Sequence, residues 1–254
     1  MLVKTLQSNS DTYTKESSMS TLLEDWRTTE ADRRHELQEL GAFWYHDGNE
    51  RRPYVRLRSG LISNGYFNGA VLCERPLYLS EFVKDLVVVY TKLDSHWLSG
   101  SIQRVVGPAM GAITLAHEVA RCLEDVYRRG GYDDSVHMSF AEKEGDGFVF
   151  KRSKPVANER ILLVEDTITT GGSVLKVCNA ISETAPNAVR VPVLLALCNR
   201  SGSETLDGMQ IASLVSGDFR TWKEGENPFT PDGKEHVPVV ENVKDNWNLL
   251  TRDY

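Results

Sequence analysis

Two adjacent carboxylates, Glu165 and Asp166, come directly after an apolar run at residues 161–164. An unpaired charge beside a buried strand is costly, so these acids require a polyhydroxylated or metal-bound partner. The residues that follow offer hydroxyls and backbone N–H groups at the start of a predicted helix, where free donors and the helix dipole favour a phosphate monoester. These residues are Thr167, Ile168, Thr169, Thr170, Gly171, Gly172 and Ser173.

The combination has a specific chemical meaning. Acids that hold vicinal hydroxyls, next to amides that hold a phosphate, are what a ribose 5-phosphate requires. The plain alternative is a helix cap formed by Glu165 and Asp166, followed by glycines that only turn the chain. The length of the contiguous pattern favours the sugar-phosphate site over a cap.

The chain around this site is organised as units of strand, loop and helix. Apolar strands that alternate with helices predict parallel pairing through right-handed crossovers, and hence an α/β fold with a doubly wound, mainly parallel sheet and helices on both faces. Ligands of such folds bind at the carboxyl ends of the strands, where the loops 107–111 and 165–173 lie. The predicted strands are residues 102–106, 161–164 and 189–197, and the predicted helices are residues 76–93, 113–123 and 174–181.

Less regular elements are predicted outside these units. Residues 55–72 are β-prone and contain the turn signals Ser59-Gly60 and Asn64-Gly65, of which the second is typical of a hairpin. Residues 136–150 alternate in polarity around two glycines, which predicts a hairpin or a long flexible loop. Residues 21–40 predict one or two surface helices.

Composition excludes several classes of function. The net charge of −7 disfavours nucleic acid as a partner, because nucleic-acid binding draws on Lys and Arg that face phosphates. No stretch approaches the roughly 20 apolar residues of a membrane span, and the first residues lack the apolar core of a secretion signal, so we expect a cytoplasmic protein. The four cysteines form no C-x-x-C pair and the six histidines no metal-binding cluster, so we expect reduced packing cysteines and no metal held mainly by the protein.

The motif at residues 161–173 resembles the substrate signature of the type I phosphoribosyltransferases, which use 5-phosphoribosyl 1-pyrophosphate (PRPP). A second motif is similar to the loop with which this family grips the pyrophosphate through backbone amides, often around an unusual peptide bond. It comprises Pro108, Ala109, Met110 and Gly111. The resemblance implies Mg²⁺ bound together with PRPP, and a nucleobase as the second substrate.

Within this family the chain looks most like orotate phosphoribosyltransferase, in scattered blocks over residues 35–200. Ser59, Gly60, Tyr66 and Phe67 are similar to the stretch that contacts the base, although Tyr66 and Phe67 would equally suit the packing of a sheet. Residues 140–147 resemble the mobile catalytic loop, unless they form a hairpin whose charges are simply solvated.

The resemblance also implies roles for particular residues and an assembly. Lys143 and Glu142, together with Asp166, would be the catalytic residues, with Lys143 closing over the pyrophosphate. In orotate enzymes this loop reaches into the site of a partner subunit, which implies a homodimer. The reaction implied is the formation of orotidine 5'-monophosphate in pyrimidine nucleotide synthesis.

One departure concerns the base. Orotate enzymes usually carry a basic pair between Gly60 and Ser63, but this chain has Leu61 and Ile62, which cannot meet an anion. Four other cations are candidates for that role and the sequence does not rank them: Arg56, Arg58, Lys176 and Arg220. Two further functions stay open: a phosphoribosyltransferase for another base, and a non-catalytic regulator that senses PRPP.

The chain is predicted to divide into four segments. A flexible arm of residues 1–20 precedes an N-terminal hood on the base side, residues 21–75. The phosphoribosyltransferase core follows over residues 76–215. Residues 216–254 are rich in turns, which predicts an irregular lid or packing tail.

Overall fold

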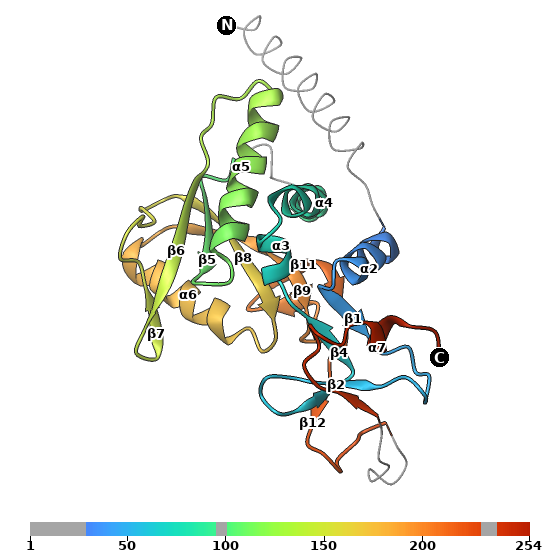
Figure 1. Ribbon diagram of the computed structural model, residues 1–254. Helices are drawn as coiled ribbons and strands as arrows, with labels where there is room; N and C mark the ends of the chain where they lie inside the picture. Colours follow the sequence, from blue (N-terminus) through green and yellow to red (C-terminus); the bar gives the residue numbers. More distant parts are fainter. Residues whose placement is uncertain (1–28, 95–100, 230–237) are drawn as a thin grey trace, which may run out of the picture.

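The computed structural model describes residues 29–94, 101–229 and 238–254 (Figure 1). The predicted arm and residues 21–28 lie outside this part of the chain. The segment 21–40 contributes helix α2 (Glu30–Glu39), which begins with a capping box between Thr29 and Asp32.

The core is a seven-stranded sheet in the order β10-β11-β9-β8-β5-β6-β7. Strands β11, β9, β8, β5 and β6 are parallel, and the edge strands β10 and β7 are antiparallel to their neighbours. The sequence prediction of a mainly parallel sheet is therefore confirmed. The strands are β5 (Arg104–Pro108), β6 (His137–Glu144), β7 (Gly147–Val149), β8 (Arg160–Ile168), β9 (Val189–Asn199), β10 (Thr205–Leu206) and β11 (Met209–Ser216).

Helices cover both faces of this sheet (Figure 1). Side chains alternate along a strand, so Leu162 of β8 packs toward α4 and α5 while Leu163 packs toward α6. The helix with Pro76 in its first turn has the predicted bounds. The helices are α4 (Pro76–Leu93), α5 (Ile113–Arg129) and α6 (Gly172–Thr184).

A smaller unit, the hood, lies beside the carboxyl end of the sheet (Figure 1). It contains a four-stranded sheet in the order β12-β3-β2-β13 and the strand pair β1-β4. Its strands come from both ends of the chain, and two short helices accompany them. These elements are β1 (Phe43–Tyr45), β2 (Tyr54–Arg56), β3 (Ile62–Ser63), β4 (Gly65–Phe67), α3 (Ala70–Cys73), β12 (Thr221–Trp222), β13 (Val239–Val240) and α7 (Asn248–Thr251).

Two expectations about the hood are corrected. The hairpin turn lies at Ser59-Gly60, between the paired strands β2 and β3, where Gly60 has φ +83°. Asn64-Gly65 instead carries the chain from β3 to β4, which pairs with β1. The segment after residue 216, expected to be irregular, supplies β12 and β13, which pair with β3 and β2. These pairings join residues far apart in the sequence, so no local signal predicts them.

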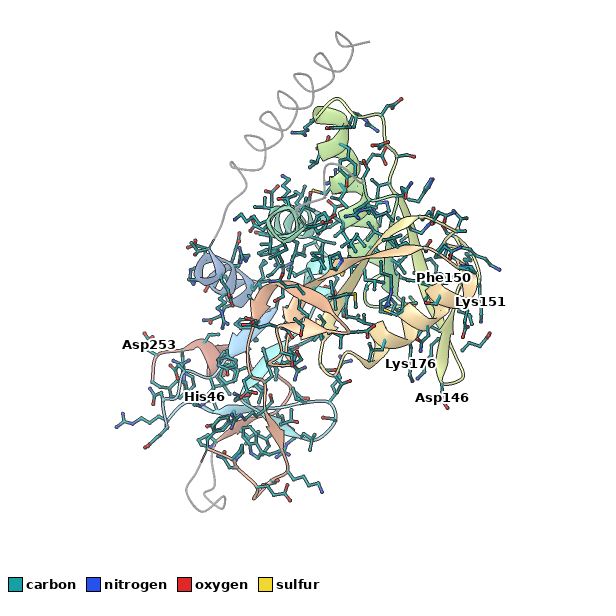
Figure 2. All side chains as sticks on the ribbon, turned by 180° about the vertical axis from the view of Figure 1, so that it is seen from behind. His46, Asp146, Phe150, Lys151, Lys176 and Asp253 are labelled. Atoms are coloured by element: carbon teal, nitrogen blue, oxygen red, sulfur yellow. The ribbon has the colours of Figure 1, made fainter. Side chains whose placement is uncertain are left out.

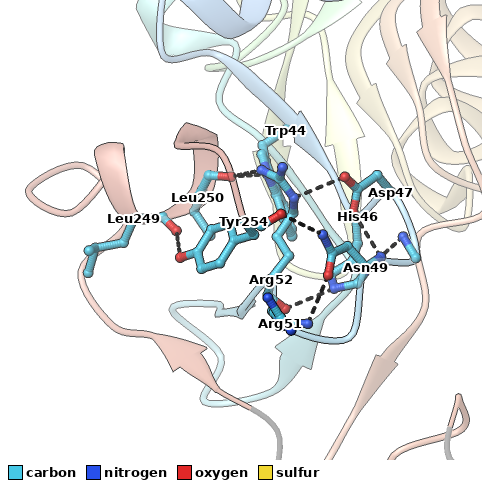
Figure 3. A network of polar contacts seen from close by, with 10 residues as sticks. Trp44, His46, Asp47, Asn49, Arg51, Arg52, Leu249, Leu250 and Tyr254 are labelled. Carbon is cyan, nitrogen blue, oxygen red and sulfur yellow. Dashed lines mark hydrogen bonds and ion pairs between the residues drawn. The ribbon is translucent and has the colours of Figure 1, made fainter.

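The end of the chain is fastened to the hood by polar contacts (Figure 3). The indole N–H of Trp44 donates to the Leu250 carbonyl at 3.1 Å, and the Asn49 side-chain amide donates to the Tyr254 carbonyl at 3.3 Å. The guanidinium of Arg52 forms an ion pair with Asp47 at 3.1 Å and lies over the Tyr254 ring, 5.2 Å from its centroid. The tail is thus a structural part of the hood.

Two further observations concern the described residues. No helix among them has the length and apolar character needed to cross a membrane. Cys122, Cys178 and Cys198 are buried and Cys73 is half-buried, and all four are free thiols, in line with their expected packing role.

Candidate active site

The acidic pair lies within the last residues of β8 rather than after the strand. The ladder with β9 continues through the pairs Glu165–Ala196 and Ile168–Asn199, which extends the strand beyond the predicted end at residue 164. Backbone pairing does not require apolar side chains, so the polar end of the strand still finds a partner in the longer β9. The acids therefore have rigid backbone positions at the carboxyl edge of the sheet.

Glu165 is nearly inaccessible, with 7% of its surface exposed. Burial, together with a hydrogen bond to Asp166 and the negative charge of that residue, raises the pKa of Glu165 to about 9. At neutral pH Glu165 is therefore protonated. The two acids have the same chemistry in the sequence, but Glu165 is buried and Asp166 is more exposed.

Glu165→Gln is expected to change the pH dependence of stability. The folded-state pKa lies above the ordinary value of 4.5, so protonated Glu165 stabilises the fold below pH 4.5, and this contribution is lost as the pH rises toward 9. The free energy of unfolding of the wild type should fall across this window, by up to about 1.4 kcal/mol per pH unit, and the fall should be smaller in the variant. Urea denaturation at pH 5 and pH 8 measures this, with the exposed Glu183→Gln as control. Equal pH slopes in wild type and Glu165→Gln would contradict the buried, protonated state.

The loop predicted to bind pyrophosphate, residues 108–111, approaches Asp166 closely. A Cβ added to Gly111 would lie 2.6 Å from Oδ2 of Asp166, so only a glycine permits this approach. Strand β5 runs through Pro108, two residues beyond its predicted end, and the loop starts at Ala109, whose peptide bond to Met110 is cis. The structure thus brings together the two motifs that the sequence assigned to ribose and to pyrophosphate.

The loop predicted to bind the 5-phosphate follows β8 and leads into α6. Gly171 takes the left-handed conformation with φ +73° at the N-cap, where no side chain caps the helix. The first N–H groups of the helix are then available to an anion. The side chains of Thr169, Thr170 and Ser173 are exposed around this turn, and the N–H of Gly172 donates to the Thr170 hydroxyl at 3.4 Å. This geometry suits the predicted phosphate site.

The four residues predicted to contact the base are not gathered in one place. Ser59 and Gly60 form the exposed tip of the β2–β3 hairpin. Tyr66 and Phe67 lie on β4, where successive side chains point to opposite faces. The Tyr66 ring packs against Trp247, at 6.0 Å between centroids.

Phe67 lies on the side of the acids. A Cβ added to Gly69 would lie 3.3 Å from the Phe67 ring and 3.6 Å from the side chain of Asp166, so the two side chains flank the same glycine. Among the four residues, the structure therefore places Phe67 beside Asp166, one of the two acids predicted to bind the ribose.

The predicted catalytic segment is a hairpin. Strands β6 and β7 pair through Glu144–Gly147, so the turn is Gly145-Asp146. Lys143 is exposed, whereas Glu142 is half-buried and lies 3.9 Å from Arg152. Figure 2 shows Asp146 on the same side of the molecule as Lys176, with His46 of the hood on the other side.

The base of this hairpin adjoins the pyrophosphate loop. The N–H of Ala109 donates to the carbonyl of Ala141 at 2.8 Å, and Glu142 and Lys143 follow directly. The backbone of Lys143 therefore lies two residues beyond the point where the hairpin contacts this loop. Its role in catalysis stays a prediction.

A further cation, Arg200, was not predicted from the sequence. It follows the last residue of β9, and its backbone N–H donates to the carbonyl of Ile168 at 2.8 Å, which places it at the edge that carries the acids and the phosphate loop. Its guanidinium lies over the ring of Phe219, 4.9 Å from the centroid. Its Nε is buried without a hydrogen-bond partner, and among residues 29–94, 101–229 and 238–254 no acid forms an ion pair with it.

Unlike Arg200, the four cations proposed from the sequence are either paired with acids or exposed to solvent. Arg56 is paired with Glu224 and Glu241, and Arg220 with Asp218 at 2.7 Å. Arg58 and Lys176 are exposed. The signal that could have found Arg200 is its position after the third apolar run, because the other two loops of the site also follow strands of the same sheet.

Comparisons with known proteins identify the family of the chain. A model described as a phosphoribosyl transferase domain matches residues 89–232. The orotate phosphoribosyltransferase of Pelotomaculum thermopropionicum is 30% identical over 203 residues, covering 80% of this chain and 94% of the relative. That of Thermoanaerobacter sp. is 31% identical over 190 residues, covering 74% and 87%.

A solved structure shares the fold. The crystal structure of orotate phosphoribosyltransferase from Aeropyrum pernix aligns with a TM-score of 0.50 at 20% identity, over 72% of this chain and 92% of that one. The family model spans more than half of the 254 residues, and the relatives align over most of their own length. The chain therefore belongs to the phosphoribosyltransferase family.

Proposed function

We propose that the protein transfers the phosphoribosyl group of PRPP to orotate, forming orotidine 5'-monophosphate and pyrophosphate. The observation that carries the choice of base is Arg200, an arginine with no acidic partner in the described chain, set at the carboxyl edge between the acids and the hood. The relatives named orotate phosphoribosyltransferase support the same choice.

Arg200 accounts for the departure at Leu61 and Ile62. Ile62 is 3% exposed and packs with Tyr54 and Trp222 inside the hood, so it forms part of a small apolar core. The carboxylate of orotate would instead pair with the guanidinium of Arg200, whose planar fork suits a carboxylate. An uncharged base would leave this partly buried cation without a counter-charge, which disfavours the alternative of a neutral base.

The proposed mechanism relies on positioning and charge. A nitrogen of the base attacks C1 of the ribose as the bond to pyrophosphate breaks, and positive charge develops on the sugar. Asp166 and Glu165 would hold the ribose hydroxyls, and Asp166 would place negative charge below that cation, while residues 167–173 would hold the 5-phosphate. The amides of residues 108–111 would bind the pyrophosphate, and Lys143 would close over it and exclude water.

Magnesium is part of the proposal. In the described chain, no three His, Cys, Asp or Glu side chains gather into a metal site, and the acids at this edge are the pair Glu165 and Asp166. Such a donor set fits Mg²⁺, which keeps several waters and binds through one or two carboxylates plus substrate phosphates. When bound, the ion would neutralise charge on the leaving pyrophosphate.

The remaining parts of the proposal are the setting and the assembly. We place the reaction in pyrimidine nucleotide synthesis in the cytoplasm, and we propose a homodimer in which the β6–β7 hairpin reaches the partner's site. Leu77 and Tyr78, at the start of α4, are 83% and 42% exposed and offer an apolar surface for association. Sedimentation analysis should give twice the mass of the chain.

An assay with several bases tests the function. Purified protein with Mg²⁺, PRPP and single bases should release pyrophosphate with orotate. If another base yields its nucleotide and orotate yields no orotidylate, that base replaces orotate as the assigned substrate. Thermal stabilisation by PRPP without pyrophosphate release from any base would instead indicate a PRPP-sensing regulator.

Arg200→Ala is expected to lower kcat/KM for orotate by about 30-fold, because a charge-assisted pair is worth about 2 kcal/mol. The KM for PRPP should change little. Arg220→Ala is the matched control, since Arg220 already has Asp218 as its partner. Equal losses in the two variants would remove Arg200 from the base site.

A further inference from the structure

Phe219 occupies a confined position between the core and the hood. It follows β11, and 9% of its surface is exposed. The rings of Phe43 and Tyr45 meet it at steep angles, with centroids 6.1 Å and 5.4 Å away and interplanar angles of 78° and 72°. The guanidinium of Arg200 also lies within cation–π distance of it, 4.9 Å from the centroid.

Two glycines make room for this ring. A Cβ on Gly65 would lie 2.3 Å from Cδ1 of Phe219, and one on Gly217 would lie 3.0 Å from Cε2. Side chains at these positions would displace the ring. The backbone of β4 therefore packs directly against Phe219, two residues before Phe67.

The turn that carries Phe219 is also held by polar contacts. The Tyr45 hydroxyl and the Asn64 side-chain amide both donate to the Asp218 carbonyl, at 3.2 Å and 3.1 Å. The N–H of Arg220 donates to Oδ1 of Asn64 at 2.8 Å. These contacts flank Phe219 on both sides along the chain, and together with the ring contacts they confine its position.

The position of the Arg200 guanidinium depends on the Phe219 ring. Among the described residues its guanidinium forms neither a side-chain hydrogen bond nor an ion pair, so the Phe219 ring is the contact that orients it. A guanidinium recognises a carboxylate by the direction of its N–H groups as well as by its charge. If Arg200 were displaced, its N–H groups would no longer point at the carboxylate, and these hydrogen bonds would be lost.

We infer that Phe219 is a positioning residue for base recognition: its ring holds Arg200 so that the guanidinium meets the carboxylate of the base. The inference rests on the proposed function. The segment after residue 216 would then contribute to the choice of base. The packing of Phe219 against Gly65 and Gly217 would determine how well the protein distinguishes a base with a carboxylate from one without it.

The test compares two nucleotides that differ by this carboxylate. Dissociation constants of orotidine 5'-monophosphate and uridine 5'-monophosphate are measured by calorimetry for the wild type, Phe219→Leu and Phe219→Met. Leu removes the aromatic face, and Met removes it while nearly filling the space. Phe229→Leu is the control, because Phe229 is another aromatic beside an arginine, 5.5 Å from Arg220, and is 45% exposed.

Both Phe219 variants should bind orotidylate about tenfold more weakly and bind uridylate within twofold of the wild type. In the Arg200→Ala background, Phe219→Leu should add no further loss. Equal weakening of both nucleotides would assign Phe219 a purely structural role, and an unchanged ratio would also overturn the inference. A wild-type protein that prefers uridylate and forms no orotidylate would refute the proposed function itself. Melting curves ensure that only folded variants are compared.

Discussion

The double variant Glu165→Ala/Asp166→Ala should lose phosphoribosyl transfer while remaining folded. Asp166 stands against Gly111 of the pyrophosphate loop, and Glu165 lies directly before it, so the pair occupies the point where ribose and pyrophosphate would meet. Removing the Asp166 charge aimed at a developing cation costs about 10²–10³-fold, and the loss of the Glu165 contact with the ribose adds to it, so we expect a loss of about 10⁴-fold in kcat/KM for PRPP.

Folding should not suffer in this variant, because it removes a carboxyl that is costly to bury. Pyrophosphate release measures activity, and thermal melting measures stability. Glu183→Ala removes an exposed acid from α6 and should behave as the wild type. Near-normal turnover in the double variant would end the assignment of the site.

Gly111→Ala is the second large expected effect. A single methyl group at this position would lie 2.6 Å from Oδ2 of Asp166, which is closer than non-bonded atoms can approach. The neighbouring group is a carboxylate on strand β8, whose backbone is held by the sheet. Either Asp166 or the loop must then move. A displacement of about 1 Å costs about 100-fold in rate, so kcat/KM for PRPP should fall at least by that factor.

Met110→Ala is the control for this prediction. The Met110 side chain is 81% exposed, and the loop is expected to bind through its backbone, so truncation should cost little. A tolerated Gly111→Ala, or a Met110→Ala variant impaired to the same degree, would show that the close approach to Asp166 is not what the reaction requires. Pyrophosphate release under saturating orotate distinguishes these outcomes.

The sequence predicted the core of the fold well because its signals are local. The helix that starts at Pro76 has an apolar periodicity and a first-turn proline, and the structure has the same bounds. The strand ends were less accurate. β5 and β8 both extend past the last apolar residue, because neighbouring strands continue to pair with them.

The hood was less predictable because its pairings are long-range. Asn64-Gly65 has the composition of a hairpin turn, but β4 finds its partner in β1 rather than in β3. Strands β12 and β13 are two residues long, too short for a recognisable alternation, and pairing with β3 and β2 defines them.

By itself, the sequence predicted a sugar-phosphate site, because Glu165, Asp166 and residues 167–173 are contiguous and their chemistry follows from their order in the chain. Only the tertiary structure decided what completes the site. It set Gly111 against Asp166, buried Glu165 so that its proton is retained, and placed Arg200 over Phe219. Each of these depends on segments distant in the chain that meet at one edge of a sheet, and such proximity leaves no pattern in neighbouring residues.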